Sequence, residues 1–130
     1  MYLIDTNVFL ELLLKQEKAV SVEAFFKRID SDKINLSDFS FYSIGIILFK
    51  SKKLNLFSSF TDDVVKNEVN IINYPYSKLN DLRIISERFS LDFDDAYQYV
   101  IAQKYNLTIV SFDKDFDKTD IKRKEPIELL

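Results

Sequence analysis

The N-terminal stretch reads Tyr2-Leu3-Ile4-Asp5-Thr6-Asn7-Val8-Phe9-Leu10. Its first apolar run ends abruptly in polar residues, and a second apolar run follows at once. The pattern predicts a short buried strand at about residues 2–5 that carries Asp5 at its C-terminal tip, with Thr6 or Asn7 starting a helix. Ligands of open α/β sheets bind outside the carboxyl ends of the strands. Because an unpaired carboxylate is costly to bury, Asp5 is a candidate site residue.

A stretch near the C-terminus repeats this arrangement. It reads Leu107-Thr108-Ile109-Val110-Ser111-Phe112-Asp113-Lys114-Asp115. A strand is expected at residues 107–110, with Asp113 and Asp115 in the turn that follows. Two strands that each end in acidic residues predict a shared acidic pocket, and such pockets hold hard divalent cations. The alternatives are a solvated turn for Asp113 and Asp115, and a helix cap for Asp5.

The composition limits the chemistry that such a pocket can perform. The chain has 130 residues, is 47% hydrophobic and contains neither Cys nor His. This length predicts a single domain over residues 1–130 with a proper core. The missing residue types exclude disulfides, Ser-His-Asp and Cys-His catalysis, and zinc sites made of thiolates or imidazoles. Hydrolysis would therefore depend on carboxylates, together with a metal ion.

Charge and hydropathy bear on location and partners. The net charge is −3, which does not indicate a generally basic surface for nucleic acid. Basic residues gather at residues 50–53 and 114–124, either as solvated faces or as a groove that follows phosphates. No basic leader precedes the first apolar run, and no apolar stretch reaches the roughly 18 residues of a membrane helix. We therefore expect a cytoplasmic protein without a membrane partner.

Strand and helix patterns alternate along the chain, without a linker or repeat. Further strands are expected at residues 33–36 and 69–72, and a final short strand at 127–130 is expected to cover a sheet edge. The helices between them are expected at residues 7–14, about 20–30, 39–49, 50–67 as one or two pieces, from a cap at Ser77 to about 89, and from Asp92 or Asp94 to about 105. This alternation predicts an α/β fold, a three-layer α/β/α sandwich around a mainly parallel sheet.

The segment at residues 39–49 is mostly apolar and is expected to form a buried helix. It contains the only glycine, Gly45. Glycine inside a helix costs about 1 kcal/mol relative to Ala. We therefore expect Gly45 to allow close packing against a neighbouring element.

A third acidic segment opens the penultimate helix. It reads Leu91-Asp92-Phe93-Asp94-Asp95-Ala96. Carboxylates at a helix start interact favourably with the positive end of its dipole, and this accounts for Asp92 and Asp94. Asp95 lies on one helical face with Tyr99 and Ala102, at spacings of four and seven. Because that face should be buried, we expect Asp95 to point toward the top of the sheet.

Taken together, the three motifs resemble those of PIN domain proteins, and most closely the small single-domain members found as VapC-type toxins. The resemblance covers nearly all 130 residues. It rests on the segments Leu3-Ile4-Asp5-Thr6-Asn7, Asp95-Ala96 with Ala102, and Val110-Ser111-Phe112-Asp113-Lys114-Asp115-Phe116. Each motif alone is weak, and their order, spacing and position at strand ends make the set specific.

The resemblance implies a metal-dependent endoribonuclease with a doubly wound α/β/α sandwich, as in the toxin of a toxin–antitoxin pair. Asp5, Asp95 and Asp113 would gather around Mg2+ or Mn2+, with Asp115 beside them as a supporting or fourth ligand. An ion held there would activate water and neutralise charge developing on the phosphodiester. No separate organic cofactor is implied.

The resemblance also implies supporting positions, with one departure. The expected supporting residues are Thr6, Asn7 and Ser111. The family normally has a Glu six residues after a Ser that ends the second strand, and counting from Ser37 this position is Ser43. The nearby Asp38 is a further candidate for support, although it stands at a helix start where capping is the alternative.

The expected partners follow from the same resemblance. RNA in a single strand or a structured loop is the expected substrate, because an A-form duplex hides its base edges. A toxin would have an antitoxin protein. Homodimers are common in the family, and the apolar helices between residues 39 and 60 could supply an interface or belong to the core. Their aromatic residues are Phe41, Phe49, Phe57 and Phe60.

Two alternatives to this nuclease remain. The missing Glu favours a catalytically impaired PIN-like module that binds nucleic acid or protein. A receiver or a haloacid-dehalogenase-like phosphatase is the other acidic-pocket α/β class. It fits poorly, because phosphatases need Asp-x-Asp after the first strand and Asp5 is followed by Thr6 and Asn7.

Overall fold

A parallel sheet of four strands forms the centre of the protein, in a computed structural model that describes all residues 1–130. The strands are β1 (Tyr2–Ile4), β2 (Ile34–Ser37), β3 (Asn70–Ile72) and β4 (Thr108–Val110). Their order across the sheet is β3-β2-β1-β4, and every neighbouring pair is parallel. The predicted parallel sheet and the positions of its four strands are therefore confirmed.

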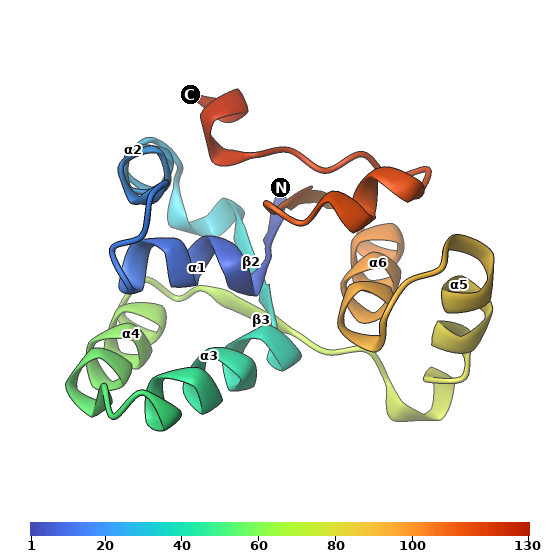
Figure 1. Cartoon of the computed structure of the whole chain (residues 1–130), viewed down its shortest axis with the longest axis horizontal. Helices are drawn as coiled ribbons and strands as arrows, with labels where there is room; N and C mark the ends of the chain where they lie inside the picture. Colours follow the sequence, from blue (N-terminus) through green and yellow to red (C-terminus); the bar gives the residue numbers. More distant parts are fainter.

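Helices cover both faces of this sheet, as Figure 1 shows. On one face lie α1 (Thr6–Leu13), α2 (Ala19–Arg28), α3 (Asp38–Lys50) and α4 (Leu54–Lys66). On the other face lie α5 (Asp81–Phe89) and α6 (Phe93–Tyr105). This arrangement confirms the three-layer α/β/α fold. Residues 50–67, predicted as one or two helices, contain a single helix.

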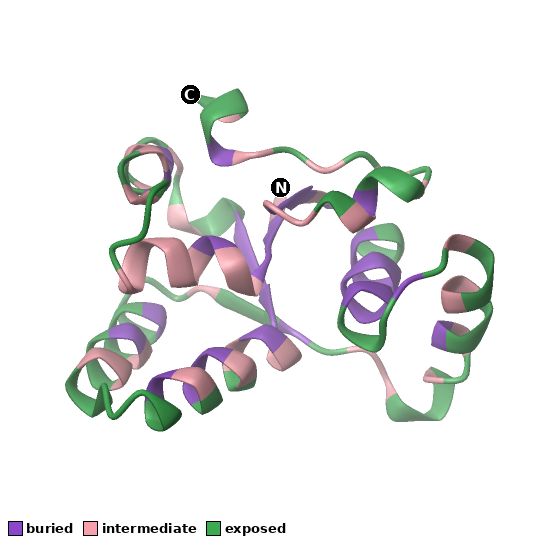
Figure 2. Ribbon diagram, in the orientation of Figure 1, coloured by how far each residue is buried: buried purple, intermediate pink, exposed green.

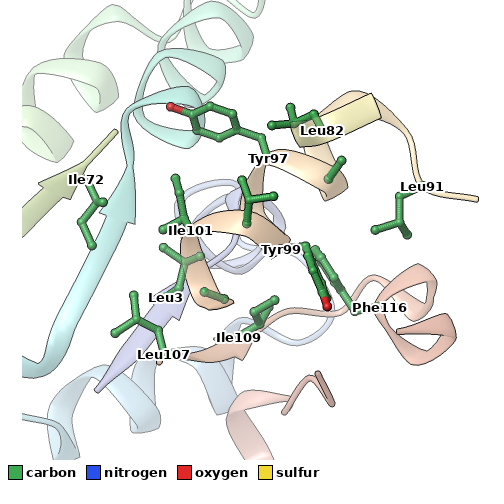
Figure 3. Close-up of a cluster of buried hydrophobic side chains, with 13 residues drawn as sticks. Leu3, Ile72, Leu82, Leu91, Tyr97, Tyr99, Ile101, Leu107, Ile109 and Phe116 are labelled. Carbon is green, nitrogen blue, oxygen red and sulfur yellow. The ribbon is translucent and has the colours of Figure 1, made fainter. Parts of the chain in front are cut away.

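Alternating strand residues divide the core between the two faces, because successive side chains of a strand point to opposite sides. Leu3 and Ile109 pack among the residues of α5 and α6, as Figure 3 shows. Their neighbours Ile4 and Val110 pack on the opposite face, against α1 and α2. Burial is concentrated in β1, β2, β4 and α6, and Figure 2 shows it in purple. Within α6, every residue from 95 to 102 is buried.

The strand order places a crevice beside Asp5. From β1 the chain proceeds to β2 and β3 on one side, and it returns to pair β4 with the other side of β1. Such a reversal of strand order is where open α/β sheets bind ligands, outside the carboxyl ends of the strands. The Asp5 N–H donates to the Val110 carbonyl at 2.9 Å, so the two strand ends stay joined up to Asp5.

Gly45 allows α3 to pack closely on α4, as the sequence predicted. A Cβ atom at this position would lie 3.2 Å from Cε1 of Phe57, which is closer than about nine in ten real contacts of a Cβ. The same α3, however, is not a fully buried helix. Tyr42, Ile46 and Phe49 are 65%, 57% and 56% exposed. They recur at helical spacing and form an apolar stripe on the surface, which we call the α3 stripe.

The C-terminal segment differs from the prediction. Residues Pro126–Leu129 form a 3₁₀ helix, so the strand predicted for residues 127–130 is wrong. The edge of β4 is instead covered by Lys124, which forms a parallel bridge with Val110. The proline that begins the 3₁₀ helix has no N–H to donate to a strand ladder, which disfavours a strand there.

The start of α5 also differs from the prediction. Ser77 lies inside a short 3₁₀ helix at Tyr76–Lys78, and α5 begins only at Asp81 after Asn80. The predicted cap at Ser77 is therefore wrong. Pro75 explains the early turn, because its carbonyl accepts the Lys78 N–H and starts the 3₁₀ helix before the α-helix.

No helix in the structure combines the length and the apolar character that crossing a membrane requires.

Candidate active site

Asp5 is buried at the end of β1, with an exposed fraction of 8%. Its Oδ2 accepts a hydrogen bond from Ser111 Oγ at 2.7 Å. Its Oδ1 accepts from the Thr6 N–H at 2.9 Å and from Gln98 Nε2 at 3.1 Å. Burial raises the pKa of Asp5, because the loss of solvation outweighs these three hydrogen bonds. The site therefore holds Asp5 in one orientation and disfavours its bare charge.

Three further carboxylates meet beside the end of β4. Asp95, Asp113 and Asp115 each offer an oxygen, and these oxygens lie within 4.8 Å of one another. We call these three residues the acidic cluster. Asp95 comes from the first turn of α6 and is 4% exposed. Burial, and then the charge of Asp113, raise the pKa of Asp95 to about 8. Lys118 contacts Asp115 at 3.2 Å from the outer side.

A cleft of about 540 Å³ joins Asp5 to the acidic cluster. Its wall contains Asp5, Thr6, Asn7, Asp95 and Asp113 among the predicted site residues. Asp115 belongs to the acidic cluster without lining the cleft, and Asp38 lies outside both. Five carboxylates line the cleft in total, and no Lys or Arg does: Asp5, Asp92, Asp94, Asp95 and Asp113.

Ser111 connects the two strand ends. Its Oγ donates to Asp5 and accepts from the Asp113 N–H at 2.9 Å and from Asn7 Nδ2 at 3.3 Å. Asn7 also accepts the Phe112 N–H at 3.2 Å through Oδ1. The hydroxyl of Ser111 thus ties the loop after β1 to the loop after β4. This is the geometry that a supporting role for Asn7 and Ser111 requires.

Asp38 does not line the cleft, and its carboxylate is hydrogen-bonded to a tyrosine. Its Oδ1 accepts from the Tyr97 hydroxyl at 2.8 Å and from the Phe39 N–H at 2.8 Å. The helix cap of α3 is Ser37, whose Oγ accepts the Ser40 N–H at 3.0 Å. Ser37 is therefore the cap of α3, and the capping alternative given above for Asp38 is wrong.

The position expected to hold Glu does face the cleft. Ser43 lies in the second turn of α3 and lines the same cleft as Asp5, Asp95 and Asp113. No carboxylate from α3 enters the cleft in this chain.

Sequence reasoning missed Gln98 and the acids before Asp95. Gln98 is 1% exposed, and its Nε2 bridges Asp5 Oδ1 and Ser40 Oγ at 3.1 and 3.0 Å. The available signal was its spacing of three from Asp95 on the same helix. Asp92 precedes α6 without making a capping hydrogen bond, and both it and Asp94 line the cleft. Helix-start chemistry therefore accounts for only part of their environment.

Solved structures with a similar fold include toxins and a toxin–antitoxin complex. VapC20 from Mycobacterium tuberculosis, a toxin that cleaves the sarcin-ricin loop, superimposes with a TM-score of 0.82 at 12% identity, covering 97% of this chain and 100% of that one. A chain of a toxin–antitoxin complex from Klebsiella pneumoniae gives 0.74 at 17% identity, covering 97% and 98%. FitAcB from Neisseria gonorrhoeae gives 0.77 at 20% identity, again covering 97% and 98%. Identities this low show a shared fold.

The sequence itself identifies the family. A comparison with curated proteins gives no significant match. The family model of the PIN domain matches residues 2–122, which is nearly the whole chain and includes every residue of the cleft. The protein therefore belongs to the PIN domain family.

Proposed function

We propose that this protein is a metal-dependent endoribonuclease. The observation that carries the proposal is the convergence of carboxylates from three distant segments on one cleft at the carboxyl edge of the sheet. Asp5 follows β1, Asp95 opens α6 and Asp113 follows β4. PIN domain proteins are generally nucleases, which supports the assignment of a phosphodiester substrate.

The donor set fits a hard divalent cation. It consists only of carboxylate oxygens, which suit Mg2+ and Mn2+ better than softer metals. Burial raises the pKa of Asp95, and repulsion by the charge of Asp113 raises it further; a cation beside the two carboxylates would relieve both effects. We assign Asp5, Asp95 and Asp113 as the ligands of the ion, with Asp115 completing or supporting the set from the outer side.

The residues of the cleft divide the chemical work. When bound, the metal lowers the pKa of the attacking water and stabilises negative charge on the phosphate. Ser111 and Gln98 hold the two oxygens of Asp5 in place. Because the chain has no His, proton transfer falls to the carboxylates of the cleft.

The proposed substrate and partners draw on the structural neighbours. RNA is favoured because the neighbour from M. tuberculosis is described as a toxin that cleaves the sarcin-ricin loop. An antitoxin partner is favoured by the complex from K. pneumoniae. The α3 stripe gives a surface on which a homodimer or an antitoxin could pack. Phe60, considered for the same interface, is 5% exposed and belongs to the core.

Cleavage of a structured RNA of mixed sequence tests the proposal. The purified protein would be incubated with Mn2+, with Mg2+ and with EDTA, beside an Asp5→Asn variant and an Asp32→Asn control at an exposed position outside the cleft. We expect cleavage that needs the metal, is lost in Asp5→Asn and persists in Asp32→Asn. Cleavage that survives in Asp5→Asn would mean that the chemistry lies elsewhere or comes from a contaminant.

A catalytically impaired binding module is the second candidate, and Ser43 is the observation that favours it. Without the Glu of α3, the cleft lacks one carboxylate of the family pattern. A Ser43→Glu variant separates the two cases. Metal-dependent cleavage by the unmodified protein contradicts the binding module. An inert protein that cleaves RNA only as Ser43→Glu would establish it.

A further inference from the structure

Three aromatic rings pack together beside the cleft, and two of them, Phe39 and Phe93, line it. Phe39 stands in the first turn of α3, Phe93 is the first residue of α6, and Tyr97 follows one turn later. The ring centroids of Phe39 lie 5.8 Å from Phe93 and 6.0 Å from Tyr97. Phe93 and Tyr97 are stacked at 6.1 Å with an angle of 20° between their planes. We call these three rings the aromatic wall.

The aromatic wall presents one exposed ring on a fixed support. Phe93 is 57% exposed although Tyr97 covers part of its ring, whereas Tyr97 itself is 6% exposed. Two hydrogen bonds hold the hydroxyl of Tyr97 in place: it donates to Asp38 at 2.8 Å and accepts from the Tyr74 N–H at 2.9 Å. A ring stacked on so rigid a neighbour loses little conformational freedom when it binds a flat ligand.

The charge of the cleft restricts what this ring can bind. Five carboxylates line the cleft and no Lys or Arg balances them, so a nucleic-acid strand gains no direct contact between phosphate and a basic side chain there. Phe39 and Phe93 line the same cleft, and an aromatic ring can attract a flat ligand by stacking without any charge on the ligand. The flat, uncharged part of a nucleotide is its base. Bases of every kind stack on aromatic side chains.

We propose that Phe93, supported by Phe39 and Tyr97, stacks against an unpaired nucleobase of the strand whose phosphodiester lies at the acidic cluster. This assignment rests on the proposed endoribonuclease function. It also narrows the substrate, because a base inside a duplex is covered by its own neighbours and cannot stack on Phe93. Single strands, bulges and loops are therefore the expected targets.

A neutral probe isolates the stacking contact. A trinucleotide with uncharged methylphosphonate linkages and a central 2-aminopurine cannot be hydrolysed at a phosphodiester, and its fluorescence falls when the base stacks. We expect saturable quenching by the unmodified protein and by Phe93→Tyr. Phe93→Leu keeps an apolar side chain without a ring and should weaken binding about tenfold, as loss of one base–aromatic contact does. Tyr76→Ala, at an 88% exposed tyrosine outside the cleft, should bind normally.

Two results of this titration would overturn the proposal. One is an equal dissociation constant for Phe93→Leu and the unmodified protein, and the other is an absence of quenching by the unmodified protein. Because Phe93 is largely exposed, the Leu variant should keep its fold, which circular dichroism would verify. A change in oligomeric state on sedimentation of Phe93→Leu would instead make this ring a contact between copies, and would also overturn the proposal.

Kinetics on single-stranded RNA separate this inference from the proposed function. Phe93→Leu should raise KM about tenfold and leave kcat within about twofold, while Phe93→Tyr restores KM. An abasic site that removes the stacked base should raise KM for the unmodified protein and leave that of Phe93→Leu unchanged. If the protein cleaves RNA and Phe93→Leu has an unchanged KM, the stacking proposal is wrong and the proposed nuclease function is not affected. If the protein quenches the probe but cleaves no RNA, the proposed nuclease function is wrong and the stacking proposal is still supported.

Discussion

At the scale of single residues, Gln98 occupies an unusual position between three elements. It belongs to α6, and its amide nitrogen reaches Asp5 after β1 and Ser40 on α3. Its Oε1 is buried and has no hydrogen-bond partner. Most buried polar atoms are paired, and an unpaired one costs about 1–3 kcal/mol. The protein tolerates this cost at a position that fixes one carboxylate of the cleft.

We predict that Gln98→Leu weakens Mn2+ binding about tenfold, because groups that orient a ligand typically contribute 10–100-fold to metal affinity. Metal-free stability should change little, since the substitution removes an unpaired acceptor together with the two hydrogen bonds of the amide. Calorimetric titration with Mn2+ and thermal melting in EDTA measure the two effects.

Gln103→Leu is the matched control, because the same substitution falls on the same helix at an exposed residue. Its Mn2+ affinity should equal that of the unmodified protein. If Gln98→Leu also bound Mn2+ with unchanged affinity, Asp5 would need no help from Gln98 to bind the ion.

At the scale of elements, the strand ends were predictable and the contacts between elements were not. Parallel strands place their carboxyl ends at one edge, so the acids after residues 2–5 and 107–110 could be expected to meet. Gln98 could not be found in this way, because its role depends on β1 and α3 lying beside α6. The prediction of a C-terminal strand was wrong for a similar reason. Lys124 covers the sheet edge instead, and this contact could not be predicted from hydrophobic periodicity.

The apolar run of α3 shows a further limit of pattern reading. A helix that is apolar on all sides reads as a buried one. In the structure, Ile44 and Leu48 are buried while Ile46 and Phe49 face outward. Hydrophobicity alone does not separate a core from a surface that a partner covers.

Close packing of α3 on α4 yields a second prediction. Gly45→Val should destabilise the protein by about 2 kcal/mol, because its side chain would overlap the ring of Phe57 and overpacking costs about 1–3 kcal/mol. Urea unfolding measures the change. Phe57→Ala provides the test of mechanism, since shortening this side chain should remove more than half of the cost of Gly45→Val. Equal costs in both backgrounds would place the strain elsewhere.

At the scale of the whole molecule, the clustered carboxylates that suit a metal ion lower the stability of the metal-free protein. The chain carries a net charge of −3 and places five carboxylates around one cleft. Such a site is unfavourable to the metal-free fold, because its acids repel one another and two of them are buried. Proteins commonly accept strain of this kind at sites of function. Here it has a measurable signature in the pH dependence of stability.

The metal-free protein should lose stability as pH rises from about 5 to about 8. The folded-state pKa of Asp95 is raised from 3.8 to about 8, and that of Asp5 is raised as well. An acid with a raised pKa contributes stability that is complete below its unfolded pKa and is lost as pH rises through its folded pKa. Glu125, whose pKa is lowered, acts in the opposite direction only at lower pH. The melting temperature in EDTA should therefore fall across this window and level off above it.

Two further measurements decide whether the acidic cluster causes that slope. Asp95→Asn removes one of the two carboxyl groups with a raised pKa and should make the fall in melting temperature in EDTA shallower. Adding Mg2+ should raise the melting temperature most at pH 8, because cations compete with protons for the carboxylates and the protons have then left. A melting temperature that stays constant or rises from pH 5 to 8 in EDTA would contradict the raised pKa of Asp95, which burial and then the charge of Asp113 cause. If the proposed ion and the proton bind the same oxygens, one pH series measures both the stability of the fold and the affinity of the cleft for the ion.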